Sequence, residues 1–188
     1  MTPRVPLPDD AALSDEMRET LGRLPPLNVF RMMANAPASF QPWIAFAGSI
    51  LLQSEFDARK REIAVLRVGH VTRAPYEWTQ HVRIAKSLGV TDGEIAAIAI
   101  DGPVTGLDAE GNFLCRVADE ISRDVRLSDE ALGELLRRYG VRQSTELILC
   151  ISYFNMLSRI LESTRVELEA ADPFDGKSPL EASRGLSR

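Results

Sequence analysis

The sequence predicts an all-α fold of about seven or eight helices. Apolar residues recur at spacings of three and four through most of the chain, which is typical of amphipathic helices. Ser, Thr and Asp residues that can cap a helix stand before several of these periodic segments, and Pro or Gly residues separate them. No segment alternates apolar and polar residues convincingly over five positions, so we expect no sheet.

The N-terminal part of the chain should contain an arm and three helices. Residues 1–13 include three prolines and are expected to form an extended arm. Ser14 can cap the first helix, which should stop before Pro25 because the residue before a proline is pushed out of the helical region. A short helix should follow over Asn28–Ala34, and apolar spacing predicts a longer one over Ser39–Gln53.

The middle of the chain should form two helices separated by a short break, and then a third helix. Asp57 is a suitable cap for a helix that contains Glu62. The sequence Arg73-Ala74-Pro75 should end that helix, and the next should begin at Tyr76, since proline fits a first helical position. The sequence Thr91-Asp92-Gly93-Glu94 has the spacing of a capping box that leads into the third helix.

The C-terminal part should add three more helices. Their expected ranges are 108–125, 128–140 and 144–168, and the last is the longest. We therefore expect a single helical domain over residues 14–171. The residues that follow, 172–188, have few groups to bury and should form a flexible tail.

Composition narrows the class of function. The chain of 188 residues is 45% hydrophobic and 26% charged, as in an ordinary globular protein. Its net charge of -5 and its scattered Lys and Arg residues argue against nucleic-acid binding, which would require a basic stripe. The N-terminus lacks the apolar core of a signal peptide, and the longest apolar stretch, Leu147–Leu157, is too short to span a bilayer. We expect a cytoplasmic protein that binds neither membranes nor nucleic acids.

The same apolar stretch bears on assembly. Leu147–Leu157 is apolar nearly all round, so it should be buried on every side, either at the centre of the fold or under another subunit. We therefore predict a homo-oligomer. Cys115 and Cys150 are not in a CxxC arrangement and should be buried, reduced thiols, with a redox pair across the fold or between subunits as the alternative.

Three ionisable residues are the candidates for catalysis. Glu62 opens an almost wholly apolar run, and Glu77 and His81 are four residues apart, so they lie on one face of a helix. A partly buried carboxylate near an imidazole favours proton transfer near neutral pH. Each residue also has a structural interpretation: Glu77 suits a first helical turn, His81 could be a core histidine, and Glu62 could be a surface acid.

These residues resemble the motif of the carboxymuconolactone decarboxylase and alkylhydroperoxidase D (AhpD-like) superfamily. In its peroxidase branch a glutamate stands twelve residues before a CxxC pair, and a histidine follows the second cysteine by four. Glu62 and His81 match those two positions, whereas Ala74 and Glu77 stand where the cysteines would be. Tyr76 falls inside the same turn, as it often does in the family. The likeness is firm over 57–97, and the helical pattern is compatible over 15–168.

The resemblance implies an AhpD-like helical fold, assembled as a trimer or hexamer, although dimers are commoner among proteins generally. Thiol peroxidase activity requires an activated thiolate beside a resolving cysteine, and neither residue is present in this turn. The decarboxylase branch implies acid–base chemistry on a small organic acid or lactone: decarboxylation, isomerisation or hydration. His81 would be the general acid or base, Glu62 would orient it and raise its pKa, and Glu77 would be a second proton donor or acceptor.

Substrate binding is expected to involve Tyr76 as a hydrogen-bond donor, together with Trp78 and Arg159. Arg73 and Arg83 are equally suited to holding a substrate carboxylate. Trp78 is also a plausible core residue.

Other functions remain open at this point. The carboxylates and His81, with His70, could ligate a divalent metal, but there is no HxxxH or HxH pair, so we expect no metal and no cofactor. Peroxidase-like antioxidant activity is an alternative from family membership. A non-catalytic oligomer that binds a small molecule is another.

Overall fold

The structure, a computed structural model, describes residues 4–171 and 173–174, and these residues form helices and no strand. The all-α prediction is confirmed. A short 3-10 helix, η1 (Asp10–Ala12), precedes eight α-helices within the described residues. These are α1 (Asp15–Arg23), α2 (Asn28–Met33), α3 (Pro37–Leu52), α4 (Ala58–Val71), α5 (Pro75–Ser87), α6 (Asp92–Ile98), α7 (Ala109–Asp124) and α8 (Asp129–Thr164).

Side-chain caps begin most of these helices. In five of them the capping oxygen accepts a hydrogen bond from a backbone N–H three residues further on, and the caps are Ser14, Asp57, Thr91, Asp108 and Ser128. The capping box at the start of α6 is complete, with the Glu94 carboxylate accepting from the backbone N–H of Thr91. Helix α3 begins two residues before the predicted Ser39, because Pro37 occupies its first turn, where the missing N–H leaves nothing unsatisfied.

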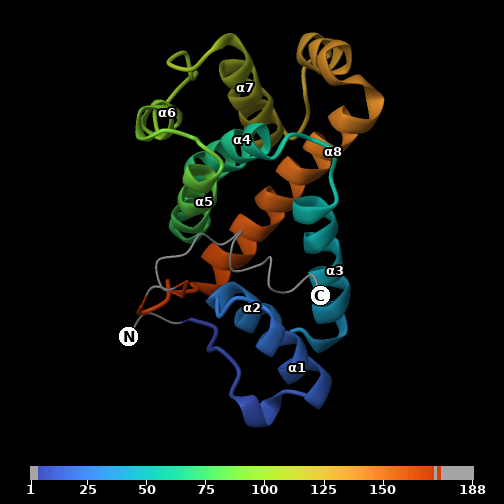
Figure 1. The fold of residues 1–188 in the computed structure, drawn as a ribbon, viewed down its shortest axis with the longest axis vertical. Helices are drawn as coiled ribbons and strands as arrows, with labels where there is room; N and C mark the ends of the chain where they lie inside the picture. Colours follow the sequence, from blue (N-terminus) through green and yellow to red (C-terminus); the bar gives the residue numbers. More distant parts are fainter. Residues whose placement is uncertain (1–3, 172, 175–188) are drawn as a thin grey trace.

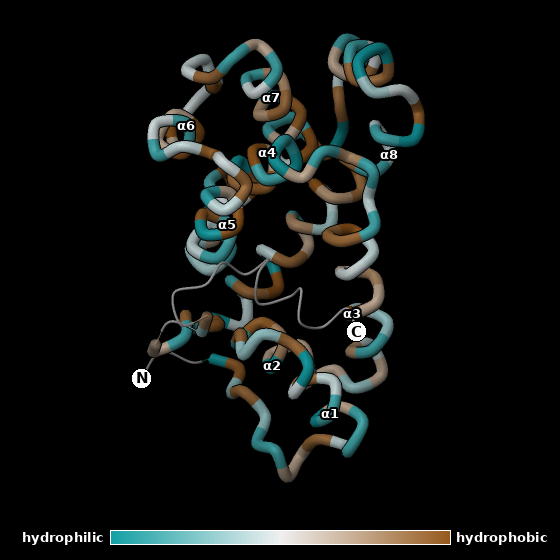
Figure 2. The backbone as a smooth tube through the Cα atoms, viewed as in Figure 1, coloured by the Kyte–Doolittle hydropathy of each residue, from teal (hydrophilic) through white to brown (hydrophobic). Residues whose placement is uncertain are grey.

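Helix α4 lies at the centre of the core. All residues from Arg61 to Gly69 are buried, and α4 packs against α5, α6, α7 and α8. Most of the surrounding helices carry both hydrophobic and hydrophilic residues along their length (Figure 2). Helices that pack one face against the core and expose the other need this mixture. Arg67 is fully buried on α4, where it pairs with Asp119 of α7 at 2.7 Å and donates to the carbonyl oxygens of Ile98, Ile100 and Gly102. Arg67 therefore fixes α7 and the loop after α6 to the central helix.

Helix α8 crosses the molecule diagonally between the α4, α5 and α7 group and the α1, α2 and α3 group (Figure 1). It bends at Gly140, whose φ of 69° and ψ of 178° are not helical, where the sequence predicted one helix to end before the next. Its C-terminus lies at Thr164, four residues before the predicted Leu168. Arg165 adopts a left-handed conformation there and ends the helix.

The two ends of the chain were predicted to lie outside the helical domain. In the described part of the predicted arm, residues 4–9 have no regular structure, η1 follows, and Leu13 is buried against Met17 and Phe40. The predicted tail, 172–188, lies outside the described residues except for Pro173 and Phe174. None of the helices in the described part of the chain is long and apolar enough to cross a membrane.

Candidate active site

The packing of α5 on α4 brings Glu62 and His81 together. Arg73 adopts a φ of 54° and turns the chain sharply, and Pro75 then begins α5. The two helices approach closely at Gly69, where a Cβ atom would lie 3.4 Å from the backbone nitrogen of Trp78. The Nδ1 atom of His81 consequently lies 2.6 Å from Oε2 of Glu62, which is fully buried.

Glu77 completes a line of three ionisable groups. Its Oε2 atom lies 3.5 Å from Nε2 of His81, one helical turn away on α5. The sequence predicted that these two residues share a helix face, and the distance agrees with that prediction. Both side chains are buried. The imidazole therefore has one carboxylate at each ring nitrogen, with Glu62 on the side of the core.

Two neighbours define the surroundings of this line. Arg61 is buried, and its Nε atom donates to Oε1 of Glu62 at 3.4 Å, which supplies a positive charge beside the innermost carboxylate. Phe154 of α8 packs edge-on against the ring of His81, with 4.6 Å between ring centroids. The imidazole is thus held by the hydrogen bond to Glu62 on one side and by an aromatic contact on another.

These surroundings shift the pKa values of Glu77 and His81. Burial raises the pKa of Glu77 from 4.5 to about 7; the charge of Glu62 adds to the rise, and His81 opposes it. Burial alone lowers the pKa of His81, but the charge and the hydrogen bond of Glu62, together with Glu77, outweigh burial and raise it above 6.5. Glu77 can therefore exchange protons near neutral pH, and the raised pKa of His81 favours its imidazolium form.

A cavity of about 310 Å³ opens onto Glu77 and His81 between α2, α3, α5 and α8. This volume suits a small molecule. The lining is mostly apolar, and among the described residues it includes no lysine or arginine. The lining residues are Leu24, Pro25, Leu27, Val29, Phe30, Trp43, Ile44, Ala47, Gly48, Leu51, Leu52, Tyr76, Glu77, Gln80, His81, Ile84, Tyr153, Phe154, Leu157 and Phe174.

Tyr76 also lines the cavity, but its hydroxyl is engaged elsewhere. The O–H donates to Oε1 of Glu169 at 2.6 Å and accepts a hydrogen bond from the backbone N–H of Val29 at 3.1 Å. Burial, followed by the hydrogen bond to Glu169, raises the pKa of Tyr76, which keeps the hydroxyl protonated. Since its only proton is directed at Glu169, Tyr76 in this arrangement cannot donate to a substrate, the role expected from the sequence.

The structure does not bring Trp78 and Arg159 to the cavity. Trp78 lies where α5 crosses α4, with its ring 6.2 Å from that of His70. Arg159 is exposed on α8 and donates to the backbone and side-chain oxygens of Asn155. Periodicity predicted that both residues are helical but could not fix which way each helix face turns.

The two histidines and two cysteines do not gather at one site. The Nε2 atom of His70 lies 3.5 Å from Asp101, away from the cavity lining. Cys115 and Cys150 are buried free thiols on α7 and α8; burial raises the pKa of Cys115 to about 12 and also raises that of Cys150. The described residues include no cluster of three or more His, Cys, Asp and Glu side chains suited to a metal ion.

A larger cleft, of about 570 Å³, lies between α7, the loop at Gly102 and the first part of α8. Most of its charged side chains pair with one another: Arg116 with Glu120, Arg123 with Asp119, and Arg138 with Glu134. It contains neither member of the Glu77 and His81 pair. We therefore place the candidate site in the smaller, apolar cavity.

Sequence reasoning missed four residues of this region. Gln80 lies one turn after Tyr76, so their helical spacing could have identified it. Tyr153 gave no signal beyond a polar group within the apolar run Leu147–Leu157. Arg61 gave no signal beyond its place beside Glu62, and Glu169 lies after α8, in a segment with no pattern to indicate where it packs.

Comparisons with known proteins bear on the family and the fold. Residues 37–120 match the Carboxymuconolactone decarboxylase family. No curated protein sequence matches the chain.

Two solved structures share the fold. One is an uncharacterized peroxidase-related protein from Ralstonia eutropha JMP134, described as an alkylhydroperoxidase AhpD core, with a TM-score of 0.76, 17% identity, and coverage of 89% of this chain and 92% of the other. The second is an uncharacterized peroxidase-related protein from Silicibacter sp. TM1040, with a TM-score of 0.74, 19% identity, and coverage of 90% and 94%. These similarities confirm the expected AhpD-like helical fold.

Proposed function

We propose that this chain, whose residues 37–120 match the Carboxymuconolactone decarboxylase family and whose fold is AhpD-like, catalyses acid–base chemistry on a small lactone or related carbonyl compound. The observation that carries the proposal is the line from Glu62 through His81 to Glu77, which ends in an apolar cavity. A buried carboxyl group with a pKa near neutrality, as Glu77 has, is suited to proton transfer at carbon.

In the proposed reaction Glu77 is the group that meets the substrate. Its carboxylate takes a proton from the carbon beside the carbonyl, and the electrons of the C–H bond move into the carbonyl group to form an enolate. The proton returns at the same carbon or at a conjugated one, which exchanges or isomerises the substrate without a co-reactant. His81 receives or supplies protons through Nε2, while the bond from Nδ1 to Glu62 fixes its orientation and stabilises the imidazolium.

The cavity lining narrows the class of substrate. A free carboxylate would enter a site that already holds Glu77, with Glu62 behind His81, and that offers no lysine or arginine among its described lining residues. A neutral lactone avoids this repulsion. Decarboxylation and hydration would use the same proton donor. Decarboxylation, however, requires a carboxylate substrate, which the cavity disfavours. We therefore favour isomerisation or proton exchange of a neutral carbonyl compound.

Tyr153 takes the role that the sequence assigned to Tyr76. It lines the cavity, and its ring contacts Phe154 at 5.1 Å and Phe46 at 5.6 Å between centroids. Burial raises the pKa of Tyr153, which keeps it protonated as a hydrogen-bond donor for the carbonyl oxygen of the substrate.

A thiol peroxidase cycle is not part of the proposal. Ala74 and Glu77 occupy the turn in which that cycle would need two cysteines, and neither offers a sulfur. Cys115 and Cys150 are buried on other helices.

The test is deuterium incorporation from D₂O into simple lactones, followed by NMR with the purified protein. We expect catalysed exchange that falls about a hundredfold or more in H81Q and E77Q, since general acid–base catalysis contributes effects of that size. H70Q is the matched control and should retain full activity, because His70 lies away from the cavity.

Two results would count against this reaction. Exchange that proceeds equally well in H81Q would remove His81 from the mechanism. Lactones that bind, as shown by quenching of Trp43 fluorescence in a W78F background, but do not exchange would favour the non-catalytic binding protein instead.

A further inference from the structure

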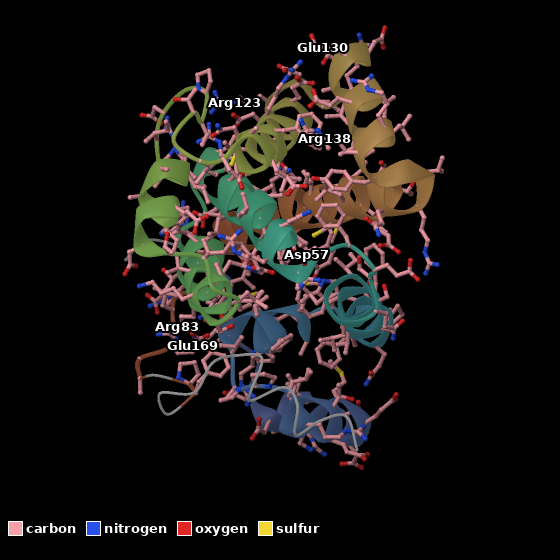
Figure 3. All side chains as sticks on the ribbon, turned by 45° about the horizontal axis from the view of Figure 1, so that its top comes forward. Asp57, Arg83, Arg123, Glu130, Arg138 and Glu169 are labelled. Atoms are coloured by element: carbon pink, nitrogen blue, oxygen red, sulfur yellow. The ribbon has the colours of Figure 1, made fainter. Side chains whose placement is uncertain are left out.

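The chain that follows α8 forms hydrogen bonds with α2 and α5. We call residues 166–170 the strap. Figure 3 shows Glu169, on the strap, beside α2. Its Oε1 atom accepts from the backbone N–H of Asn28 at 2.7 Å and from the hydroxyl of Tyr76 at 2.6 Å, and its Oε2 atom accepts from Nε2 of Gln80 at 2.7 Å.

Further contacts hold the strap and the residues after it at the cavity. The side-chain nitrogen of Asn28 donates to the carbonyl oxygen of Glu167 at 2.9 Å. Beyond the strap, Phe174 is buried and forms part of the cavity lining. The segment after α8 thus meets both the wall of the cavity and the helix that carries the candidate catalytic groups.

Three neutral donors from two helices converge on the Glu169 carboxylate, and this arrangement is selective for an anion. A carboxylate presents only acceptors, so it satisfies all three donors at once. These three hydrogen bonds make Glu169 more than a surface acid.

The donors on α5 lie next to the candidate catalytic groups. Tyr76 immediately precedes Glu77, and Gln80 immediately precedes His81, so the two pairs lie one turn apart on the same helix. Holding Tyr76 and Gln80 fixes the rotation of these two turns, and with it the direction in which Glu77 and His81 face. Glu169 is absent from the cavity lining, so it acts through its partners and not on a ligand.

We propose that Glu169 is a positioning residue that locks the first turns of α5 through Tyr76 and Gln80, and that Phe174, carried behind the strap, limits the size of the ligand. The catalytic part of this inference rests on the proposed acid–base function. The structural part does not, so the two can fail separately.

The first experiment measures backbone amide exchange of the full chain by mass spectrometry. In E169A we expect the amides at the start of α5 to exchange about tenfold faster or more, because that region loses two hydrogen bonds to the strap, those of Tyr76 and Gln80. Millimolar formate should reverse the change, since a free carboxylate can meet the same donors. E167A is the matched control: the Glu167 side chain pairs with Arg4 at the surface, so its removal should leave α5 unchanged.

The second experiment measures the rate at which the protein exchanges lactone protons for deuterium. E169A should lower kcat about tenfold with a much smaller change in KM, and formate should restore the rate, because misplacing a catalytic group by a fraction of an ångström affects the chemical step most. F174A should instead extend binding, measured by Trp43 fluorescence, to lactones with longer alkyl chains.

Unchanged amide exchange at the start of α5 in E169A, or a faster amide exchange that formate does not reverse, would overturn the positioning role of Glu169. Identical ligand-size limits in F174A and the wild type would overturn the role of Phe174. Formate-reversible loosening of α5 in a protein that exchanges no lactone would support the positioning role and reject the proposed reaction.

Discussion

At the scale of single residues, Glu77 gives the clearest link between structure and pH. Its folded pKa, about 7, lies above its ordinary value of 4.5, so the folded protein holds this proton more tightly than the unfolded chain does. The stabilisation is complete below about pH 4.5 and is lost as the pH rises through 7. His81 acts in the same direction, because its pKa is also raised on folding.

We predict that E77Q removes part of this pH dependence. Glutamine keeps the shape of the protonated side chain but cannot ionise, so the variant should lose less stability than the wild type between pH 5 and pH 8, by a difference on the order of 3 kcal/mol. Urea unfolding at the two pH values measures this difference. Equal losses in the two proteins would show that Glu77 ionises as freely in the folded state as in the unfolded chain.

The sequence could predict part of the candidate site. Glu77 and His81 are local on one helix, so their shared face followed from spacing alone, and Glu62 was identified because a carboxylate is unusual in an apolar run. Glu169 could not be found in this way, because it contacts Tyr76 from 93 residues away in sequence and lies outside any periodic segment. The position of Arg159 outside the cavity lining could not be foreseen for a related reason, since helical periodicity does not say which neighbour a polar face meets.

At the scale of elements, the bend in α8 depends on one glycine. The φ of 69° and ψ of 178° at Gly140 fall in a region that is essentially restricted to glycine. A Cβ atom at this position would meet no atom within 4 Å, so the penalty for a side chain is backbone strain and not a clash.

We predict that G140A destabilises the protein by about 1–3 kcal/mol, the usual penalty for such a conformation. Gly133, in the first part of the same helix, provides the matched control. A Cβ atom there makes only an ordinary contact with Arg137, so G133A should be neutral or stabilising by up to about 1 kcal/mol. Thermal unfolding of both variants measures the contrast, and an equally harmless G140A would mean that the bend does not require glycine.

Helix starts were more predictable than helix ends. A capping side chain and a proline at the first turn are local signals, so the starts of α1, α4, α5 and α6 followed directly from the sequence. The end of α8 at Thr164 is set by the left-handed conformation of Arg165, which a non-glycine residue adopts only in a particular tertiary setting. Nothing in the residue types at that point indicates where the helix stops.

At the scale of the whole molecule, the expectation that Leu147–Leu157 is buried on every side does not hold within one chain. Leu149 and Met156 are 43% and 42% exposed on α8, and Phe46 is 39% exposed on the neighbouring helix α3. Apolar side chains on adjacent helices favour coverage by another protein surface. The exposed apolar residues are therefore where we would test the prediction of a homo-oligomer, whether dimer, trimer or hexamer.

We predict that the wild type sediments as an oligomer at micromolar concentration and that L149E sediments as a smaller species, because a charge in an apolar interface is strongly unfavourable. V125E is the control, since Val125 is exposed at the far end of α7. A wild-type protein that sediments as a monomer would exclude the assembly. An L149E assembly of unchanged size would place the interface elsewhere.

The fold class was predictable because it depends on many weak local signals that agree. The arrangement of the helices was not, because it depends on contacts such as those of Arg67 with three carbonyl groups and Asp119, which join segments far apart in sequence. The family resemblance supplied the overall architecture that periodicity alone could not.

The burial of Cys115 and Cys150 also has a kinetic consequence. Neither thiol can meet a reagent in the folded protein, and both hold their protons at neutral pH, so labelling must wait until the structure around each cysteine opens. The two lie on different helices, α7 and α8. The labelling rates of the two thiols therefore report separately on opening around α7 and around α8. We expect equal rates if the core opens as a unit and different rates if one helix loosens first.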